Sequence, residues 1–353
     1  MKNWENNIRK AKPYTPGEQP REEGMVKLNT NENPYPPSPR ILELCRNMDW
    51  GQLRLYPDPA AKVLTDALAA YHGLLPEQVF AGVGSDDVLA MAFLTFFHSS
   101  APILFPDITY SFYPVWADLF QIPYERPRLA EDFSIVPSDY FGVNGGIIFP
   151  NPNAPTGCAM GLEQIREIMD HNRDVVVIVD EAYVDFGAVS ALPLLKEYDN
   201  LLIVRTYSKS RSMAGMRIGY ALGNPRLIGY LNDVKYSFNS YTLNLPSIYL
   251  GAEVLKDETY FQETLRKIVE TREWVQRELR ALGFIFRDSS TNFIFARHRS
   301  CPALKLFHAL RKKHIYVRHF DQDRIREYLR ITVGTREEME TLIDFLKQFL
   351  DAD

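Results

Sequence analysis

One lysine of this 353-residue chain stands among hydroxyl and guanidinium groups. Lys209 lies between Ser208 and a second serine, and Arg217 follows in the same segment. Upstream, Asp180 comes directly after the apolar run 175–179. A lysine amine can condense with an aldehyde as a Schiff base. An arginine with neighbouring hydroxyls can bind a phosphate, and a buried acid can keep a ring nitrogen protonated.

These three groups match the requirements of pyridoxal phosphate (PLP), an aldehyde cofactor that carries a phosphate and a ring nitrogen. Each group also has a plainer interpretation. A lysine in a loop rich in serine and arginine is usually solvated, and an acid at the end of a strand can merely cap the next element. The hypothesis therefore depends on the joint occurrence, in order, of these segments and of two others.

The two other segments could place polar groups beside the same site. Residues 82–86 read Gly-Val-Gly-Ser-Asp between a predicted strand and a predicted helix, where backbone N–H groups can bind an anion. The alternative is a tight turn capped by Ser85 or Asp86. Residues 151–157 read Asn-Pro-Asn-Ala-Pro-Thr-Gly and predict a loop. That loop either makes a structural turn or presents Asn153 as a donor at the end of a strand.

Continuous apolar runs predict the sheet that would carry these segments. Runs of this kind are typical of parallel strands covered on both faces. They occupy residues 79–81, 103–105, 146–149, 175–179 and 201–204. Helical patterns alternate with them, and the pattern at 85–97 is apolar nearly all round and should be buried. We expect an α/β fold with a mostly parallel sheet.

The C-terminal part follows a different pattern. A helix is predicted from near Glu258 to Leu282, and Gly283 would end it. Thr335 and Glu338 form a capping box for a last helix. Strands are predicted at 292–296, 316–318 and 329–333. This alternation predicts a smaller α+β domain.

The N-terminus predicts an extended arm, because prolines recur through its first forty residues and exclude a continuous helix. Its apolar residues indicate that part of the arm packs. They are Trp4, Ile8, Tyr14, Met25, Val26 and Leu28. We expect an arm at 1–35 that packs with the small domain, a large PLP-binding domain at 36–248, and a small domain at 249–353.

Composition narrows the partners. The formal net charge is −5, the pI is about 5.9, and no basic patch indicates nucleic acid. No apolar run approaches the roughly 18 residues that span a bilayer, and the start lacks a secretory signal. The cysteines Cys45, Cys158 and Cys301 form no C-x-x-C pair. We expect a cytoplasmic protein that binds small molecules and no metal, nucleic acid or membrane.

Together, these segments resemble fold type I PLP-dependent aminotransferases and, within them, the histidinol-phosphate aminotransferases. The resemblance runs essentially end to end. The Asp–Lys–Arg framework is common to many PLP enzymes, whereas 31–34 (Asn-Glu-Asn-Pro), 56–58 (Tyr-Pro-Asp) and 329–335 (Leu-Arg-Ile-Thr-Val-Gly-Thr) are more specific. At Val83 and Asp87 the family more often has asparagine and glutamate. The implied fold has a seven-stranded, mostly parallel sheet in a large domain.

The resemblance implies catalytic and ring-binding residues. Lys209 would hold the cofactor and later move a proton, and Asp180 would pair with the ring nitrogen. Tyr183 and Asn153 would hydrogen-bond the phenolic oxygen of the ring, and Asn153 would also face the substrate. Tyr110 would stack on the ring.

Ligands of the phosphate and of the substrate are implied as well. Arg330 would bind the anionic group of the substrate, assisted by Arg318 and by Tyr14 of the arm. Tyr56 would reach the cofactor phosphate from the neighbouring subunit, so the active form would be a homodimer. The other phosphate ligands would be the backbone of Ser85 and Asp86, the side chains of Thr206 or Ser208, and Arg217.

The implied activity is a ping-pong transfer of the amino group of L-histidinol phosphate to 2-oxoglutarate, which yields imidazole acetol phosphate and L-glutamate in histidine biosynthesis. The same fold leaves an aromatic amino acid aminotransferase and a threonine-phosphate decarboxylase as alternatives. A PLP-sensing regulator would need a DNA-binding module, and the N-terminal segment is too short and too rich in proline for one.

Overall fold

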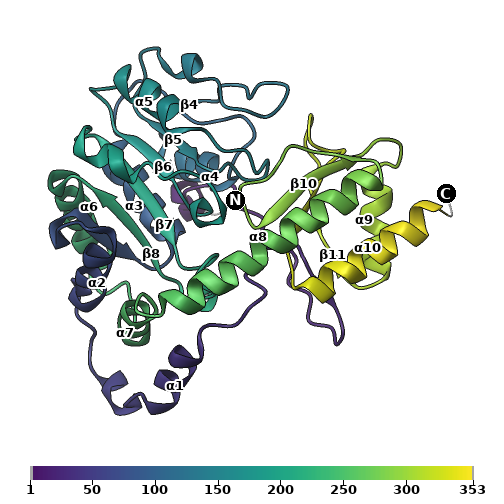
Figure 1. Cartoon of the computed structure of the whole chain (residues 1–353). Helices are drawn as coiled ribbons and strands as arrows, with labels where there is room; N and C mark the ends of the chain where they lie inside the picture. Colours follow the sequence, from purple (N-terminus) through teal and green to yellow (C-terminus); the bar gives the residue numbers. More distant parts are fainter. Residues whose placement is uncertain (1–2, 352–353) are drawn as a thin grey trace.

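The computed structural model describes residues 3–351, which form a larger and a smaller unit (Figure 1). The larger unit is built on a seven-stranded sheet of order β2-β8-β7-β6-β5-β3-β4. Its strands are β2 (Val79–Gly82), β3 (Ile103–Leu104), β4 (Tyr124–Glu125), β5 (Ile147–Pro150), β6 (Val177–Asp180), β7 (Leu201–Thr206) and β8 (Gly219–Gly223). Only β8 runs antiparallel to its neighbours, so the expected mostly parallel sheet is confirmed.

Helices cover both faces of this sheet, which explains the continuous apolar runs. In β6, Val177 and Val179 belong to one buried cluster and Ile178 belongs to the other. Helix α3 was expected to be buried, and most of its apolar side chains are buried, although Leu94 is 39% exposed. The helices of this unit are α1 (Pro39–Asn47), α2 (Lys62–His72), α3 (Ser85–Phe96), α4 (Phe112–Phe120), α5 (Leu162–Asp170), α6 (Pro225–Phe238) and α7 (Leu245–Val254).

Short 3-10 helices occupy several of the connections. They are η1 (Asn3–Asn7), η2 (Trp50–Arg54), η3 (Pro76–Gln78), η4 (Pro137–Tyr140), η5 (Val184–Phe186), η6 (Leu192–Lys196) and η7 (Ala214–Met216).

The smaller unit packs helices against an antiparallel sheet of order β12-β13-β10-β9. Gly283, at φ +86°, follows the end of the long helix α8 as expected. The capping box is present, because the Thr335 N–H donates to Glu338 Oε2 (2.7 Å) and the Glu338 N–H to Thr335 Oγ1 (3.3 Å). The elements are α8 (Glu258–Ala281), β9 (Phe284–Ile285), β10 (Phe293–His298), α9 (Ala303–Lys312), β11 (Ile315–Tyr316), β12 (Arg318–His319), β13 (Leu329–Thr332) and α10 (Arg336–Asp351).

The N-terminal arm contacts both units. Its strand β1 (Val26–Lys27) pairs in parallel with β11 of the smaller unit. Further upstream, the Tyr14 ring stacks on Phe112 of α4 at 4.2 Å. Trp4 and Ile8, which were expected to pack, are 58% and 48% exposed. The arm therefore contacts the smaller unit through β1 and the larger unit through Tyr14.

Helix α7 packs against α1 and α2, and α8 then crosses from the larger unit to the smaller one (Figure 1). We propose that the two units divide between α7 and α8 instead of at residue 248. Among residues 3–351, no helix combines the length and the apolar composition needed to cross a membrane.

Candidate active site

A cavity of about 230 Å³ opens where three parallel strands end. Pro150, Asp180 and Thr206 are the last residues of β5, β6 and β7, and all three line it. Ligands of open α/β sheets bind at this edge, beyond the carboxyl ends of the strands. The full lining is Gln19, Thr30, Glu32, Ser85, Asp86, Tyr110, Pro150, Ala154, Asp180, Ala182, Tyr183, Thr206, Ser208, Lys209, Ala214 and Arg217.

Asp180 supplies a buried carboxylate, with only 4% of the residue exposed. The Tyr113 hydroxyl donates to its Oδ2 (2.8 Å) and the Ala182 N–H to its Oδ1 (3.1 Å). Burial raises the pKa of Asp180 to about 6, although these two hydrogen bonds oppose the shift. A positive charge placed beside this group would favour its ionised form.

Lys209 lies in the loop that follows β7 and reaches the same cavity. Its Nζ donates to the Thr30 carbonyl (3.3 Å) and lies 5.7 Å from the centroid of the Tyr183 ring. The Asn33 amide donates to the Lys209 carbonyl (3.0 Å). The arm therefore contacts both the amine and the backbone of this lysine.

Two tyrosines, Tyr183 and Tyr110, line the cavity together with Lys209 and Asp180. The Tyr183 hydroxyl accepts a hydrogen bond from the Asn31 amide (2.8 Å), and the Tyr110 hydroxyl donates to Asp86 Oδ1 (2.7 Å). Burial raises the pKa of Tyr110 well above its ordinary value, so its hydroxyl stays protonated. Both residues line the cavity, and their expected contacts with a cofactor ring remain predictions.

The opposite end of the cavity gathers groups that suit an anion. Ser85 and Asp86 begin α3, and the first N–H groups of a helix have no partner within it. Arg217 Nη2 donates to Asp86 Oδ2 (3.3 Å). A Cβ on Gly84, whose φ is +91°, would lie 2.5 Å from that Nη2, so only glycine lets the guanidinium approach. The Thr206 hydroxyl lies at the same end of the cavity and donates a hydrogen bond to the Ser208 hydroxyl (3.0 Å).

Arg330 and Arg318 lie on β13 and β12 and are not part of the cavity lining given above. Arg330 Nη2 donates to the Asn29 carbonyl (3.0 Å), whereas its buried Nε has no hydrogen-bond partner in the described part of the chain. Burial lowers the pKa of Arg330. An anion that reached this guanidinium would gain a partially desolvated donor.

Three further predicted site residues are not part of the cavity lining. Tyr14 stacks on Phe112, and Tyr56 is 83% exposed with its ring 4.8 Å from that of Tyr241. The Asn153 amide donates to the Ile108 carbonyl (2.9 Å) and to Thr156 Oγ1 (3.0 Å). Its Oδ1 accepts from the Thr109 hydroxyl (3.0 Å), so all three side-chain hydrogen bonds of Asn153 go to neighbouring residues of the protein. The roles of these three residues therefore remain predictions.

Sequence reasoning missed two neighbours of the site. Tyr113 donates to Asp180, and Asn31 donates to Tyr183. Asn31 had a signal, because it belongs to the Asn-Glu-Asn-Pro stretch. Tyr113 had none, since no local pattern relates a residue of α4 to the end of β6.

The family model for aminotransferases of class I and II matches residues 23–346. The chain belongs to this family. Curated relatives of this aminotransferase include the histidinol-phosphate aminotransferase of Lactococcus lactis subsp. cremoris, which is 52% identical over 98% of both chains. The enzyme of the same name from Clostridium botulinum is 48% identical over 99% of both chains.

Solved structures agree with this aminotransferase fold. The histidinol-phosphate aminotransferase of Clostridium acetobutylicum aligns with a TM-score of 0.84 at 23% identity, over 92% of this chain and 99% of that one. That of Sinorhizobium meliloti, solved in complex with pyridoxal-5'-phosphate, also aligns with a TM-score of 0.84, at 22% identity, over 93% and 91% of the two chains. At these identities the likeness establishes the fold.

Aminotransferases of this family depend on PLP, and the cavity fits that cofactor. Burial raises the pKa of Asp180, and a protonated ring nitrogen beside the carboxyl group would lower that pKa again. Gly219 lets the start of α3 pack closely against β8, because a Cβ there would lie 2.2 Å from the Ser85 backbone nitrogen. Arg217 and the start of α3 would hold the phosphate, and Lys209 would hold the aldehyde carbon.

Proposed function

We propose that this aminotransferase transfers the amino group of L-histidinol phosphate to 2-oxoglutarate, forming imidazole acetol phosphate and L-glutamate for histidine biosynthesis. The main support is the 52% identity, over 98% of both chains, to a relative named for that activity. The cavity adds chemical support, since Lys209, Asp180 and Arg217 line it together.

When bound, PLP supplies an electron sink that makes the Cα–H bond of the substrate acidic. Asp180 would keep the proton on the ring nitrogen, on which that sink depends. Lys209 Nζ would take the proton from Cα as a general base. Tyr110 and Tyr183 line the same cavity and would help to hold the ring there.

Both substrates present an anion to the same part of the site. Histidinol phosphate carries a phosphate monoester, and 2-oxoglutarate and glutamate carry carboxylates. A guanidinium can bind either group in a bidentate manner. Arg330, whose buried Nε has no hydrogen-bond partner among the described residues, and the neighbouring Arg318 would serve both half-reactions.

We also propose that the active form is a homodimer in the cytoplasm. Tyr56 is 83% exposed and lies in a stretch with other exposed apolar residues, Trp50 at 49%, Leu53 at 54% and Leu55 at 48%. Exposed apolar surface of this kind is typical of a protein interface. A second copy seated there could receive Tyr56 at its phosphate site.

A substrate panel with the purified holoenzyme tests the proposed reaction. Histidinol phosphate, phenylalanine, tyrosine and phosphothreonine are offered with 2-oxoglutarate, and kcat/KM is measured for each. We expect histidinol phosphate to react fastest. Faster turnover of phenylalanine or tyrosine would establish an aromatic aminotransferase instead. Carbon dioxide release from phosphothreonine would establish a decarboxylase.

A further inference from the structure

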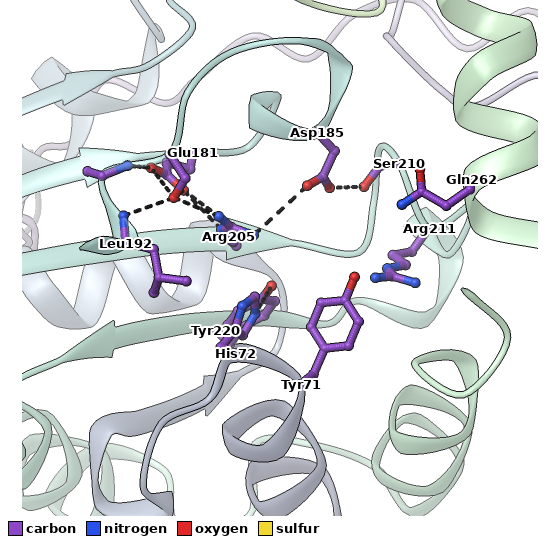
Figure 2. Close-up of polar contacts among 12 residues, drawn as sticks. Tyr71, His72, Glu181, Asp185, Leu192, Arg205, Ser210, Arg211, Tyr220 and Gln262 are labelled. Atoms are coloured by element: carbon purple, nitrogen blue, oxygen red, sulfur yellow. Dashed lines mark hydrogen bonds and ion pairs between the residues drawn. The ribbon is translucent and has the colours of Figure 1, made fainter. Parts of the chain in front are cut away.

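A chain of polar side chains connects the end of β6 to the loop that carries Lys209, and it has no part in the roles proposed so far (Figure 2). It consists of Glu181, Arg205, Asp185 and Ser210, which we name the loop-anchoring array. Glu181 directly follows Asp180, and Ser210 directly follows Lys209. The array therefore connects the neighbours of the two residues that would hold the cofactor ring and its aldehyde.

The fixed end of the array is the ion pair of Glu181, which directly follows β6, and Arg205 of the adjacent parallel strand β7. The Glu181 side chain is fully buried, and Arg205 Nε donates to its Oε2 at 2.9 Å. Ser190 Oγ (3.0 Å) and the Ala191 N–H (2.6 Å) donate to Glu181 Oε1. Because both oxygens of the Glu181 carboxylate accept hydrogen bonds, the Glu181–Arg205 ion pair is held in one orientation.

The other end of the array holds the lysine loop. Arg205 Nη1 lies 3.9 Å from Asp185 Oδ1, and Asp185 Oδ2 accepts a hydrogen bond from the Ser210 hydroxyl. Figure 2 shows Asp185 between Arg205 and Ser210, with Tyr220 and His72 below the guanidinium. Ser210 is only 4% exposed, and its carbonyl accepts from the Asn33 amide at 3.2 Å. Asp185 thus holds the side chain of Ser210 by a hydrogen bond, and Asn33 holds its backbone carbonyl.

We propose that Asp185 and Ser210 are positioning residues that fix Lys209 Nζ for proton transfer, and that the Glu181–Arg205 pair orients Asp185 for this purpose. The proposal rests on the proposed function only in taking Lys209 as the lysine that binds the cofactor. A proton carrier must stay within hydrogen-bond reach of the atom it serves, and a displacement of about 1 Å can cost roughly a hundredfold in rate.

The alternative is a purely structural role, in which the array stabilises the sheet end. A buried ion pair is weak evidence of stabilisation, because desolvation opposes the attraction. The geometry favours positioning: the terminal hydrogen bond is made to the residue that follows Lys209, in a loop that has no regular secondary structure at 207–213. The two roles differ in what the loss of that single bond changes.

The first test measures the glutamate half-reaction of PLP-loaded variants. Ser210→Ala and Asp185→Ala each remove the terminal hydrogen bond, and we expect each to lower the rate constant of proton transfer 10- to 100-fold while KM changes less than threefold. Asp185→Asn keeps an acceptor oxygen for Ser210 and should recover most of the rate. Asp170→Ala is the matched control, since Asp170 accepts from the Tyr198 hydroxyl and Arg173 of the same unit, far along the chain from Lys209.

The second test uses hydrogen exchange in the apoprotein, so it does not depend on turnover. We expect amides of residues 208–213 to exchange faster in Ser210→Ala, with those of β6 and β7 unchanged. Rates within twofold of wild type in both alanine variants would overturn the proposal, as would a rate loss without faster exchange in the loop. If Asp185→Ala does not fold, Ser210→Ala decides. Since glutamate is the amine used, failure of histidinol phosphate to react would refute the proposed function alone.

Discussion

Arg318 and Arg330 lie directly opposite each other on the antiparallel strands β12 and β13. Like charges at one register position repel. Arg318 accordingly adds to the burial that lowers the pKa of Arg330, and the Arg330 Nε has no hydrogen-bond partner within residues 3–351. An anion between the two guanidinium groups would relieve the repulsion. The pair is therefore suited to the phosphate and the carboxylate that the proposed substrates carry.

Arg330→Lys should weaken both substrates together. Lysine keeps the charge but cannot form the bidentate contact. Loss of one hydrogen bond to a charged group costs about 1.5–3 kcal/mol, so we expect KM to rise roughly 10- to 100-fold for histidinol phosphate and for 2-oxoglutarate. Separate half-reactions followed by the absorbance of the cofactor give each value. An increase confined to one substrate would contradict a shared anion site. Arg318→Lys should produce a smaller increase in both.

Asp180→Asn should remove from the apoprotein the pH-dependent free-energy penalty of ionising a buried carboxyl group. Burial holds the folded-state pKa of Asp180 near 6, against 3.8 for the ordinary carboxyl. The contribution of Asp180 to the free energy of unfolding is thus fully present below pH 3.8 and is lost as pH rises through 6. The loss amounts to up to about 3 kcal/mol, because ionisation of the buried carboxyl is unfavourable. Urea unfolding of both apoproteins at pH 4, 5, 6 and 8 measures this difference. We expect the variant to gain relative to wild type as pH rises.

The same variant should fail as an enzyme. The asparagine amide cannot keep a proton on the ring nitrogen by charge, so we expect kcat to fall by at least about a hundredfold. A variant that gained apoprotein stability and kept full activity would show that Asp180 does not serve the cofactor.

Lys209→Ala should abolish transamination while the protein remains folded. General acid–base catalysis contributes about 10²- to 10⁴-fold, and the covalent hold on the cofactor is lost as well. Borohydride reduction of the wild-type holoenzyme, followed by peptide mass spectrometry, should find the cofactor on residue 209. Labelling of a different lysine, or full activity of the variant, would exclude the proposed role.

Local features of the fold could be predicted because they depend on neighbours in sequence. The glycine stop at 283 and the Thr335–Glu338 capping box need only a few adjacent residues. The parallel strands were recognisable because both faces are buried. Strand β8 was not predicted, because a five-residue segment with glycines at both ends has little hydrophobic pattern. Its antiparallel pairing with β2 and β7 is determined by tertiary contacts that the local sequence does not encode.

The site was predictable as far as its residues end strands or begin helices. Asp180, Thr206 and Ser85 meet because parallel strands deliver their carboxyl ends to one edge. Contacts across the fold were not predictable. The Tyr113–Asp180 bond joins residues 67 apart in sequence, and the Thr30 contact of Lys209 joins residues 179 apart. Their partners are set by packing, which periodicity does not encode.

Mixed dimers should test whether Tyr56 acts in the neighbouring subunit. Alone, Lys209→Ala should be inactive, and Tyr56→Ala should be impaired by weaker phosphate binding. In a hybrid of the two, one site combines the intact Lys209 of one chain with the intact Tyr56 of the other. Its companion site lacks both residues. We therefore expect activity above that of either preparation when the two variants are unfolded and refolded together.

The measurement is kcat per hybrid dimer, isolated with two different affinity tags, and it should approach half of the wild-type value. Sedimentation must show a dimer in the same buffer. Since Tyr56 is 83% exposed in the single chain, its removal should change the free energy of unfolding of a subunit by less than about 0.5 kcal/mol. If the hybrid is no more active than Tyr56→Ala alone, Tyr56 acts within its own chain or not at all.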